Sequence, residues 1–120
     1  MVYVLTGRVW KGKGASSLWM PEYLPDLFPG TLNIKMHDIV PVIQWKTETY
    51  HEEYKRNFYM HPCTINDVSA WIIVPPLSTS RDNENGLRSE RLLEIAHPEK
   101  LRQLLSLQDK DTVTISVDSH

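Results

Sequence analysis

The sequence predicts a mainly β fold, a closed or partly closed barrel with one short helix near its C-terminus. Several segments either alternate polar and apolar residues or are rich in β-branched and aromatic residues, as strands are. Apolar residues at clear helical spacing occur in a single segment near the C-terminus. Strand follows strand without regular helical crossovers, and this order favours a barrel over a doubly wound sheet.

The sequence pattern predicts several strands. Residues 2–10 are β-branched and aromatic, and Thr31–Met36 alternates polar with apolar residues. Thr112–Val117 alternates in the same way, with its valine and isoleucine side chains pointing inward. Shorter apolar runs predict further strands at 39–45, 58–60, 69–74 (buried on both faces) and 92–96.

The remaining segments are helices, turns and loops. Leu18–Phe28 contains two prolines and predicts at most a short, interrupted helix. Pro98–Leu105 predicts a helix, because proline suits the first turn and three leucines share one face. Residues 47–56 are expected to form an exposed loop or a strand pair. Residues 77–91 are expected to form a long polar loop.

Composition excludes several classes of protein. At 120 residues the chain can bury one core without disulfides, so we expect one domain spanning residues 1–120. A net charge of -2 lacks the basic excess of a nucleic-acid binder. Cys63 is the only cysteine, and no apolar run has the length of a signal peptide or a membrane span. We expect a soluble cytoplasmic protein with neither nucleic acid nor membrane as a partner; the oligomeric state is left open.

A glycine-containing basic segment follows the first strand. Gly7–Gly14 has the glycine and lysine spacing of a P-loop, but Gly14 stands where that motif needs Ser or Thr. The following segment is also a poor helix, so we reject the P-loop. Gly12 and Gly14 still allow backbone N–H groups to approach a phosphate, and two lysines supply positive charge. Taken alone, the segment fits a solvated hairpin loop better.

Oxygen donors occur in two predicted strands. Thr31 and Asn33 are two residues apart, so their side chains point to the same side of a strand and can converge on one ligand. Neutral oxygens of this kind suit Mg²⁺. Glu94 lies within an apolar strand, where a carboxylate either faces solvent or has a partner; the functional interpretation is a carboxylate positioned to bind or deprotonate a hydroxyl. Ordinary solvent-facing polar residues remain the alternative at all three positions.

Other chemistries have less support. The start of the predicted helix, at Pro98–Arg102, offers backbone N–H groups and positive charge to an anion, or is simply an amphipathic helix. His51, His61 and Cys63 lack the spacing and the fourth ligand of a zinc site. The chain has no Gly-x-Ser-x-Gly elbow, so a serine hydrolase is not supported.

Taken in order, these segments resemble the CTP-dependent riboflavin kinases of archaeal type. Gly30-Thr31-Leu32-Asn33 is the most specific part, and Leu107–Val113 is similar to that family's last turn and strand. The resemblance spans nearly the whole chain and rests on four segments: Gly7–Gly14, Phe28–Lys35, Trp71–Pro75 and Leu93–Arg102. It implies a small six-stranded cradle-loop (RIFT-like) β-barrel that transfers the γ-phosphoryl of CTP to the 5′-hydroxyl of riboflavin, giving FMN and CDP.

The resemblance also implies roles for individual residues. Thr31 and Asn33 would ligate Mg²⁺, and Glu94 would be the catalytic carboxylate that meets the ribityl chain of the flavin. Ser78 or Thr79 would supply a flavin-side hydroxyl. The nucleotide would be bound by Gly12, Lys13, Gly14, Ala15, Glu99, Lys100, Leu101 and Arg102.

Departures from the family pattern motivate two other hypotheses. Ser16 and Ser17 replace a glycine and a basic residue, residues 18–28 look shortened, and residues 78–91 look longer. A non-catalytic barrel that binds flavin or nucleotide as a sensor or regulator is therefore the alternative. The closing turn and strand also suggest a DNA-binding barrel of the transition-state-regulator kind, against which the acidic net charge counts.

Overall fold

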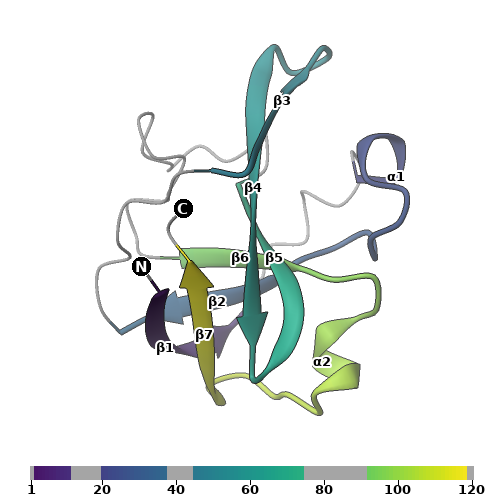
Figure 1. Cartoon of the computed structure of the whole chain (residues 1–120). Coiled ribbons are helices and arrows are strands. Elements are labelled where there is room, and N and C mark those ends of the chain that lie inside the picture. The colour runs from purple at the N-terminus through teal and green to yellow at the C-terminus, as the bar shows by residue number, and fades with distance from the viewer. Residues whose placement is uncertain (1, 12–19, 38–44, 75–91, 119–120) are drawn as a thin grey trace.

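The computed structural model describes residues 2–11, 20–37, 45–74 and 92–118. Nearly all regular structure in these ranges is β, with two helices of a single turn each (Figure 1). The helices are α1 (Met20–Tyr23) and α2 (Leu101–Leu104). The strands are β1 (Val2–Trp10), β2 (Leu32–Met36), β3 (Thr47–His51), β4 (Arg56–Ile65), β5 (Val68–Val74), β6 (Leu92–Ala96) and β7 (Thr112–Asp118).

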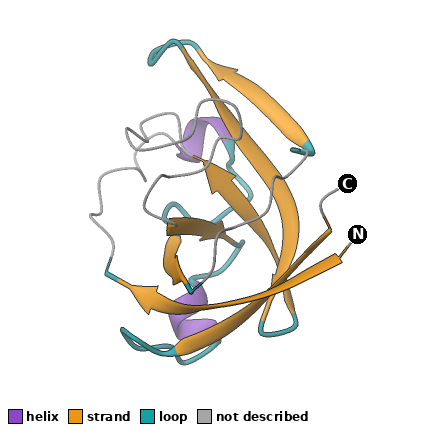
Figure 2. Cartoon of the chain, turned by 90° about the vertical axis from the view of Figure 1, so that its left-hand side faces the viewer, coloured by secondary structure: helices purple, strands orange, loops and turns teal. Residues whose placement is uncertain are grey.

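The strands form one antiparallel sheet that closes on itself. Its order is β3-β4-β5-β6-β2-β1-β7, and a further pairing between β4 and β7 closes six of the strands into a barrel. β3 remains outside the ring and extends with the first half of β4 as a hairpin arm (Figures 1 and 2). The predicted mainly β, six-stranded barrel with a short C-terminal helix is confirmed; α1 is the short, interrupted helix expected within residues 18–28.

β1 pairs with β2 on one side and with β7 on the other, and Gly7 takes part in both pairings. Gly7 is opposite Met36 of β2 and Val113 of β7. A Cβ atom at this position would lie 2.6 Å from Cγ2 of Ile34 and 2.8 Å from the backbone oxygen of Lys35. The close approach of β1 to β2 therefore requires glycine.

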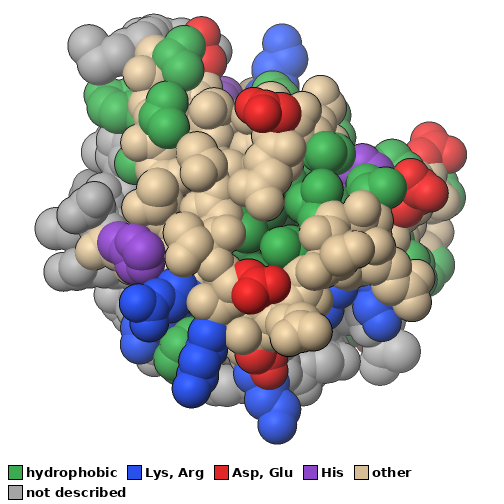
Figure 3. All heavy atoms as spheres, turned by 90° about the horizontal axis from the view of Figure 1, so that it is seen from below, with side chains coloured by type: hydrophobic (Ala, Val, Ile, Leu, Met, Phe, Trp, Pro, Cys, Tyr) green, Lys and Arg blue, Asp and Glu red, His purple; other side chains and the backbone are tan. Residues whose placement is uncertain are grey.

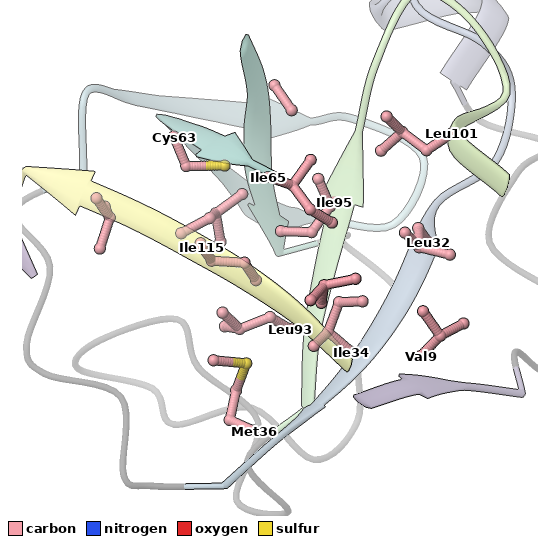
Figure 4. Close-up of a cluster of buried hydrophobic side chains, with 14 residues drawn as sticks. Val9, Leu32, Ile34, Met36, Cys63, Ile65, Leu93, Ile95, Leu101 and Ile115 are labelled. Atoms are coloured by element: carbon pink, nitrogen blue, oxygen red, sulfur yellow. The ribbon is translucent and has the colours of Figure 1, made fainter. Parts of the chain in front are cut away.

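The barrel interior holds the main apolar core. Alternate residues of each strand point inward, so β2 contributes Leu32 and Ile34 while β6 contributes Leu93 and Ile95 (Figure 4). A second, smaller cluster covers the opposite face of β4, β5 and β6, where Met20 of α1 is fully buried. Residues of β2 and β6 that alternate with the core residues consequently lie on the outer face.

β4 changes its partner along its length. Its first half pairs with β3 as far as the Thr47–Met60 pair, and its end pairs with β7 from Cys63 onward. The buried ring of His61 fills the gap between them: its Nδ1 accepts the backbone N–H of Lys46 at 3.2 Å, and its Nε2 donates to the carbonyl of Asp118. His61 therefore links the ends of both neighbours at the seam where the barrel closes.

Several predicted elements differ in extent. The strand expected at 58–60 is longer, because β4 continues through Pro62 to a two-residue turn at Asn66 and Asp67, both of which have positive φ. Residues 47–51 form a strand, so the strand-pair alternative is the right one there. Burial on both faces holds for Ile72–Val74, whereas Ser69 is exposed. The strand expected at 39–45 lies outside the described residues except for Trp45, and the whole of the loop expected at 77–91 lies outside them.

The helix predicted at 98–105 is shorter than expected. α2 begins at Leu101 after Lys100 and ends at Leu104, because the backbone of Leu105 is no longer helical (φ -101°, ψ 4°) and Ser106 has a φ of 52°. The leucine spacing overstated its length: Leu101 is buried, whereas Leu104 is 42% exposed. One turn has too few aligned peptides for the predicted anion-attracting helix start. Within the described residues, no helix is long and apolar enough to cross a membrane.

Candidate functional site

A row of paired residues crosses the outer face of the barrel and contains the predicted carboxylate. Asn33 of β2 lies between Trp10 of β1 and Glu94 of β6, and Glu94 in turn lies opposite Ile73 of β5. Paired residues of neighbouring strands share one face of the sheet. The register therefore brings together Asn33 and Glu94, which are far apart in the sequence.

Glu94 is buried although it lies on the outer face of the barrel. Its side chain is 4% exposed, and its Oε1 accepts a hydrogen bond of 2.8 Å from the hydroxyl of Thr31. Thr31 immediately precedes β2 and is half-buried. A buried carboxylate needs such partners, because the loss of water around its charge is costly. Of the two readings of Glu94 left open by the sequence, the partnered one is correct.

Asn33 carries an unusual oxygen. Its side-chain Oδ1 is buried and has no hydrogen-bond partner in the described part of the chain. Buried polar atoms are nearly always bonded, so this oxygen has the capacity to bind a further group. Thr31 lies two residues before Asn33, and the two neutral oxygens are of the kind that suits a hard cation such as Mg²⁺. The described residues contain no cluster of three or more His, Cys, Asp or Glu side chains that could hold a metal instead.

A pocket of about 100 Å³ is lined by Thr31, whereas Asn33 is not among its lining residues. One wall comes from the segment that leads into β2, including Gly30 and Thr31, and the other from the turn that contains α2. The lining residues are Phe28, Gly30, Thr31, Leu32, Ile95, Glu99, Lys100, Leu101 and Arg102. The structure thus places the four predicted nucleotide-binding residues, Glu99–Arg102, around one cavity with a predicted metal ligand.

Positive charge surrounds the outer face of β1 and β2. Arg8 lies opposite Lys35, and both side chains are exposed. The ammonium group of Lys35 lies 4.5 Å from the centroid of the Trp10 ring. Seen from below, most of the Lys and Arg side chains lie in the lower half of the view, with acidic side chains between them (Figure 3). The exposed pair of Arg8 and Lys35 can attract an anionic ligand.

Six predicted site residues lie outside the described residues. They are Gly12, Lys13, Gly14 and Ala15 for the phosphates, and Ser78 and Thr79 for the flavin. β1 ends at Trp10, opposite Asn33, so the chain leads into residues 12–15 from beside the candidate metal ligand.

Sequence reasoning missed one charged contact at the site. The guanidinium of Arg102 donates to Oδ1 of Asp109 at 2.6 Å and to the carbonyl of Trp10 at 3.4 Å. The sequence indicated only that Asp109 belongs to a segment, Leu107–Val113, with a turn followed by a strand. Arg102 and Asp109 have opposite charges but are seven residues apart. This spacing is not one of the short helical spacings at which charged side chains pair, so the sequence gave only a weak indication of the ion pair.

The fold and the site together define the class: a closed six-stranded antiparallel barrel whose outer face carries an oxygen-rich polar site next to a small pocket lined by charged residues. Comparison with known sequences then gives the family. A family model described as "Domain of unknown function DUF120", with the short name CTP-dep_RFKase, matches residues 22–117. The chain belongs to this family of CTP-dependent riboflavin kinase domains. The matched range includes Thr31, Asn33, Glu94 and the four pocket residues at 99–102, and it begins after residues 12–15.

Two curated relatives agree with this assignment. The chain is 35% identical over 100 residues to a riboflavin kinase of Methanospirillum hungatei JF-1, an alignment that covers 75% of this chain and 42% of the relative. It is 31% identical over 103 residues to a riboflavin kinase of Saccharolobus solfataricus, covering 77% of this chain and 55% of the relative. The chain therefore spans about half the length of these relatives.

Proposed function

We propose that this chain is a riboflavin kinase that transfers the γ-phosphoryl group of CTP to the 5′-hydroxyl of riboflavin, giving FMN and CDP. The observation that carries the proposal is the grouping of Thr31, Asn33 and Glu94 on one face beside the pocket of residues 99–102. The family's short name supports CTP as the donor, and the relatives' names support riboflavin as the acceptor.

The nucleotide side of the site needs charge neutralisation and fixed geometry. Lys100 and Arg102 supply positive charge at the pocket, and Gly12–Ala15 would place backbone N–H groups around the phosphates. Thr31 Oγ1 and Asn33 Oδ1 would hold Mg²⁺, which, when bound, neutralises charge on the phosphates. The Thr31 proton is donated to Glu94, so the lone pairs of its oxygen remain available for a cation.

The acceptor side depends on Glu94. A carboxylate accepts hydrogen bonds only, so Glu94 can hold a ribityl hydroxyl in position or accept its proton while it stays bonded to Thr31. Ser78 or Thr79 would bind the flavin. Phosphoryl transfer proceeds mainly through positioning and electrostatic stabilisation, so this small set of groups is sufficient.

A nucleotide comparison tests the function. The purified chain is incubated with riboflavin, Mg²⁺ and, separately, CTP, UTP, ATP or GTP, and FMN is detected by chromatography. We expect FMN to form fastest with CTP and to disappear when EDTA removes the metal. Faster turnover with ATP would remove CTP from the proposal, and no FMN with any nucleotide would refute the kinase. Tight binding of flavin or nucleotide without turnover would instead favour the sensor hypothesis.

Substitutions test the metal ligands. Thr31→Ala and Asn33→Ala should each lower turnover and raise the Mg²⁺ concentration needed for half-maximal rate, because each removes one oxygen donor. Thr49→Ala serves as the matched control, since Thr49 is exposed on β3, away from the site. Unchanged rates and unchanged metal requirements in both site variants would exclude these residues as ligands.

A further inference from the structure

Arg102 has two fixed contacts and spare hydrogen-bonding capacity. Both of its bonds, to the Trp10 carbonyl and to Asp109, come from Nη2. Among the residues that the structure describes, no acceptor is bound to its Nε or Nη1. The guanidinium is planar and rigid, so bonds at one end fix the direction of the remaining N–H groups. Arg102 lines the pocket, and its orientation there is consequently set by Asp109 and Trp10.

Asp109 is itself held firmly in place. It belongs to the turn between α2 and β7, and this turn is bonded to β1: the Lys110 N–H donates to the Val9 carbonyl at 2.7 Å, and the Val9 N–H donates to the Asp111 carbonyl at 2.8 Å. Inside the turn, the Asp111 carboxylate accepts the backbone N–H of Gln108 at 2.8 Å. The turn, the end of β1 and the Arg102 side chain therefore form one connected unit.

We propose that Asp109 is a positioning residue for nucleotide binding, which holds the Arg102 guanidinium in the orientation that receives an anionic group of the nucleotide at the pocket. The inference rests on the proposed function. Stability does not explain the contact, because the side chains of Asp109 and Arg102 are 53% and 32% exposed and such surface ion pairs contribute little to folding. The contact also joins the pocket to Trp10, from which the chain continues toward the predicted phosphate-binding residues.

Kinetics of the full chain test the proposal. Asp109→Ala should raise the KM for CTP roughly three- to tenfold with kcat within about twofold, since an arginine that has lost its fixed orientation must be ordered on binding. The dissociation constant of CDP, measured by calorimetry, should rise by a similar factor. Asp109→Glu, which keeps the carboxylate, should restore most of the affinity. In an Arg102→Ala background, Asp109→Ala should have no further effect.

Glu53→Ala is the matched control. It removes an exposed carboxylate from another turn, the one between β3 and β4, which within the described residues makes no contact with the unit that holds Arg102. We expect its nucleotide KM to match that of the unmodified chain. An unchanged KM and CDP affinity in Asp109→Ala, or an equal rise in both alanine variants, would overturn the positioning role alone. A chain that neither forms FMN nor binds CDP would overturn the proposed function and this inference with it.

Discussion

Thr31→Val is the most informative single change, because it removes a hydroxyl and keeps the shape of the side chain. The hydroxyl donates to a carboxylate that is 4% exposed, at 2.8 Å. Hydrogen bonds to charged groups contribute about 1.5–3 kcal/mol, and the variant removes this donor from the buried Glu94. We expect the free energy of unfolding to fall by about 2 kcal/mol, which corresponds to roughly 7 °C in Tm for a chain of this size.

A double-mutant cycle isolates this bond from other effects. Unfolding in urea is measured for the unmodified chain, Thr31→Val, Glu94→Leu and the double variant. Replacing both partners of a buried hydrogen bond by apolar groups costs less than removing one partner and leaving the other buried without it. The free energy of unfolding of the double variant should therefore be about 1–2 kcal/mol higher than the sum of the two single effects predicts. Thr49→Val, at an exposed threonine of β3, should change stability by less than about 0.5 kcal/mol.

The same variants connect the bond to activity. Thr31→Val should lower FMN formation by roughly 10- to 100-fold, as the loss of supporting contacts around a site commonly does. Single-variant effects on stability that add to within about 0.5 kcal/mol would show that Thr31 and Glu94 do not interact, and the geometry assigned to the site would then be wrong.

Four further predictions concern the barrel. His61→Phe orphans two backbone groups at the seam and should lower the free energy of unfolding by about 1–3 kcal/mol, whereas His37→Phe at an exposed position should change it little in the same urea titration. Gly7→Ala should lower Tm in a thermal melt, because its Cβ would lie 2.6 Å from Ile34; an unchanged Tm would refute the close approach. Burial raises the pKa of Cys63 from 9.0 to about 12, so the folded thiol should react with a disulfide reagent at pH 8 roughly a thousandfold more slowly than in urea. The stability linked to this protonated thiol is fully present below about pH 9 and should be lost as the pH rises toward 12, which a pH series of the urea titrations would reveal.

The alternation of polar and apolar residues predicted the strands that have one face in the core and the other at the surface. β2 and β7 alternate between core and surface, and their predicted limits agree with the structure to within one residue. β4 was underestimated, because only the apolar run at 58–60 was predicted as a strand, whereas the strand extends from Arg56 to Ile65 and includes Pro62. In the structure this proline lies between the stretch that pairs with β3 and the stretch that pairs with β7. The change of partner depends on residues more than 40 positions away, so no local pattern can reveal it.

The site shows the same division between local and distant information. The period of two along a strand predicts that Thr31 and Asn33 share a face, and it needs no knowledge of the fold. The position of Glu94 opposite Asn33 follows from the register of β2 against β6, which is set by the whole barrel. The contact of Asp109 with Arg102 depends on a turn bonded to β1, so the sequence predicted the turn and missed its partner.

Glu94 is better explained by chemistry than by folding. On the outer face its neighbours Ile73 and Ala96 belong to an apolar cluster, and an apolar side chain at position 94 would extend this cluster without the cost of burying a charge. Glu94→Leu should therefore leave the free energy of unfolding unchanged or higher while FMN formation is lost. If Glu94→Leu instead unfolds the chain, the carboxylate is a structural requirement of the barrel. If the folded variant still makes FMN at the original rate, Glu94 has no part in phosphoryl transfer.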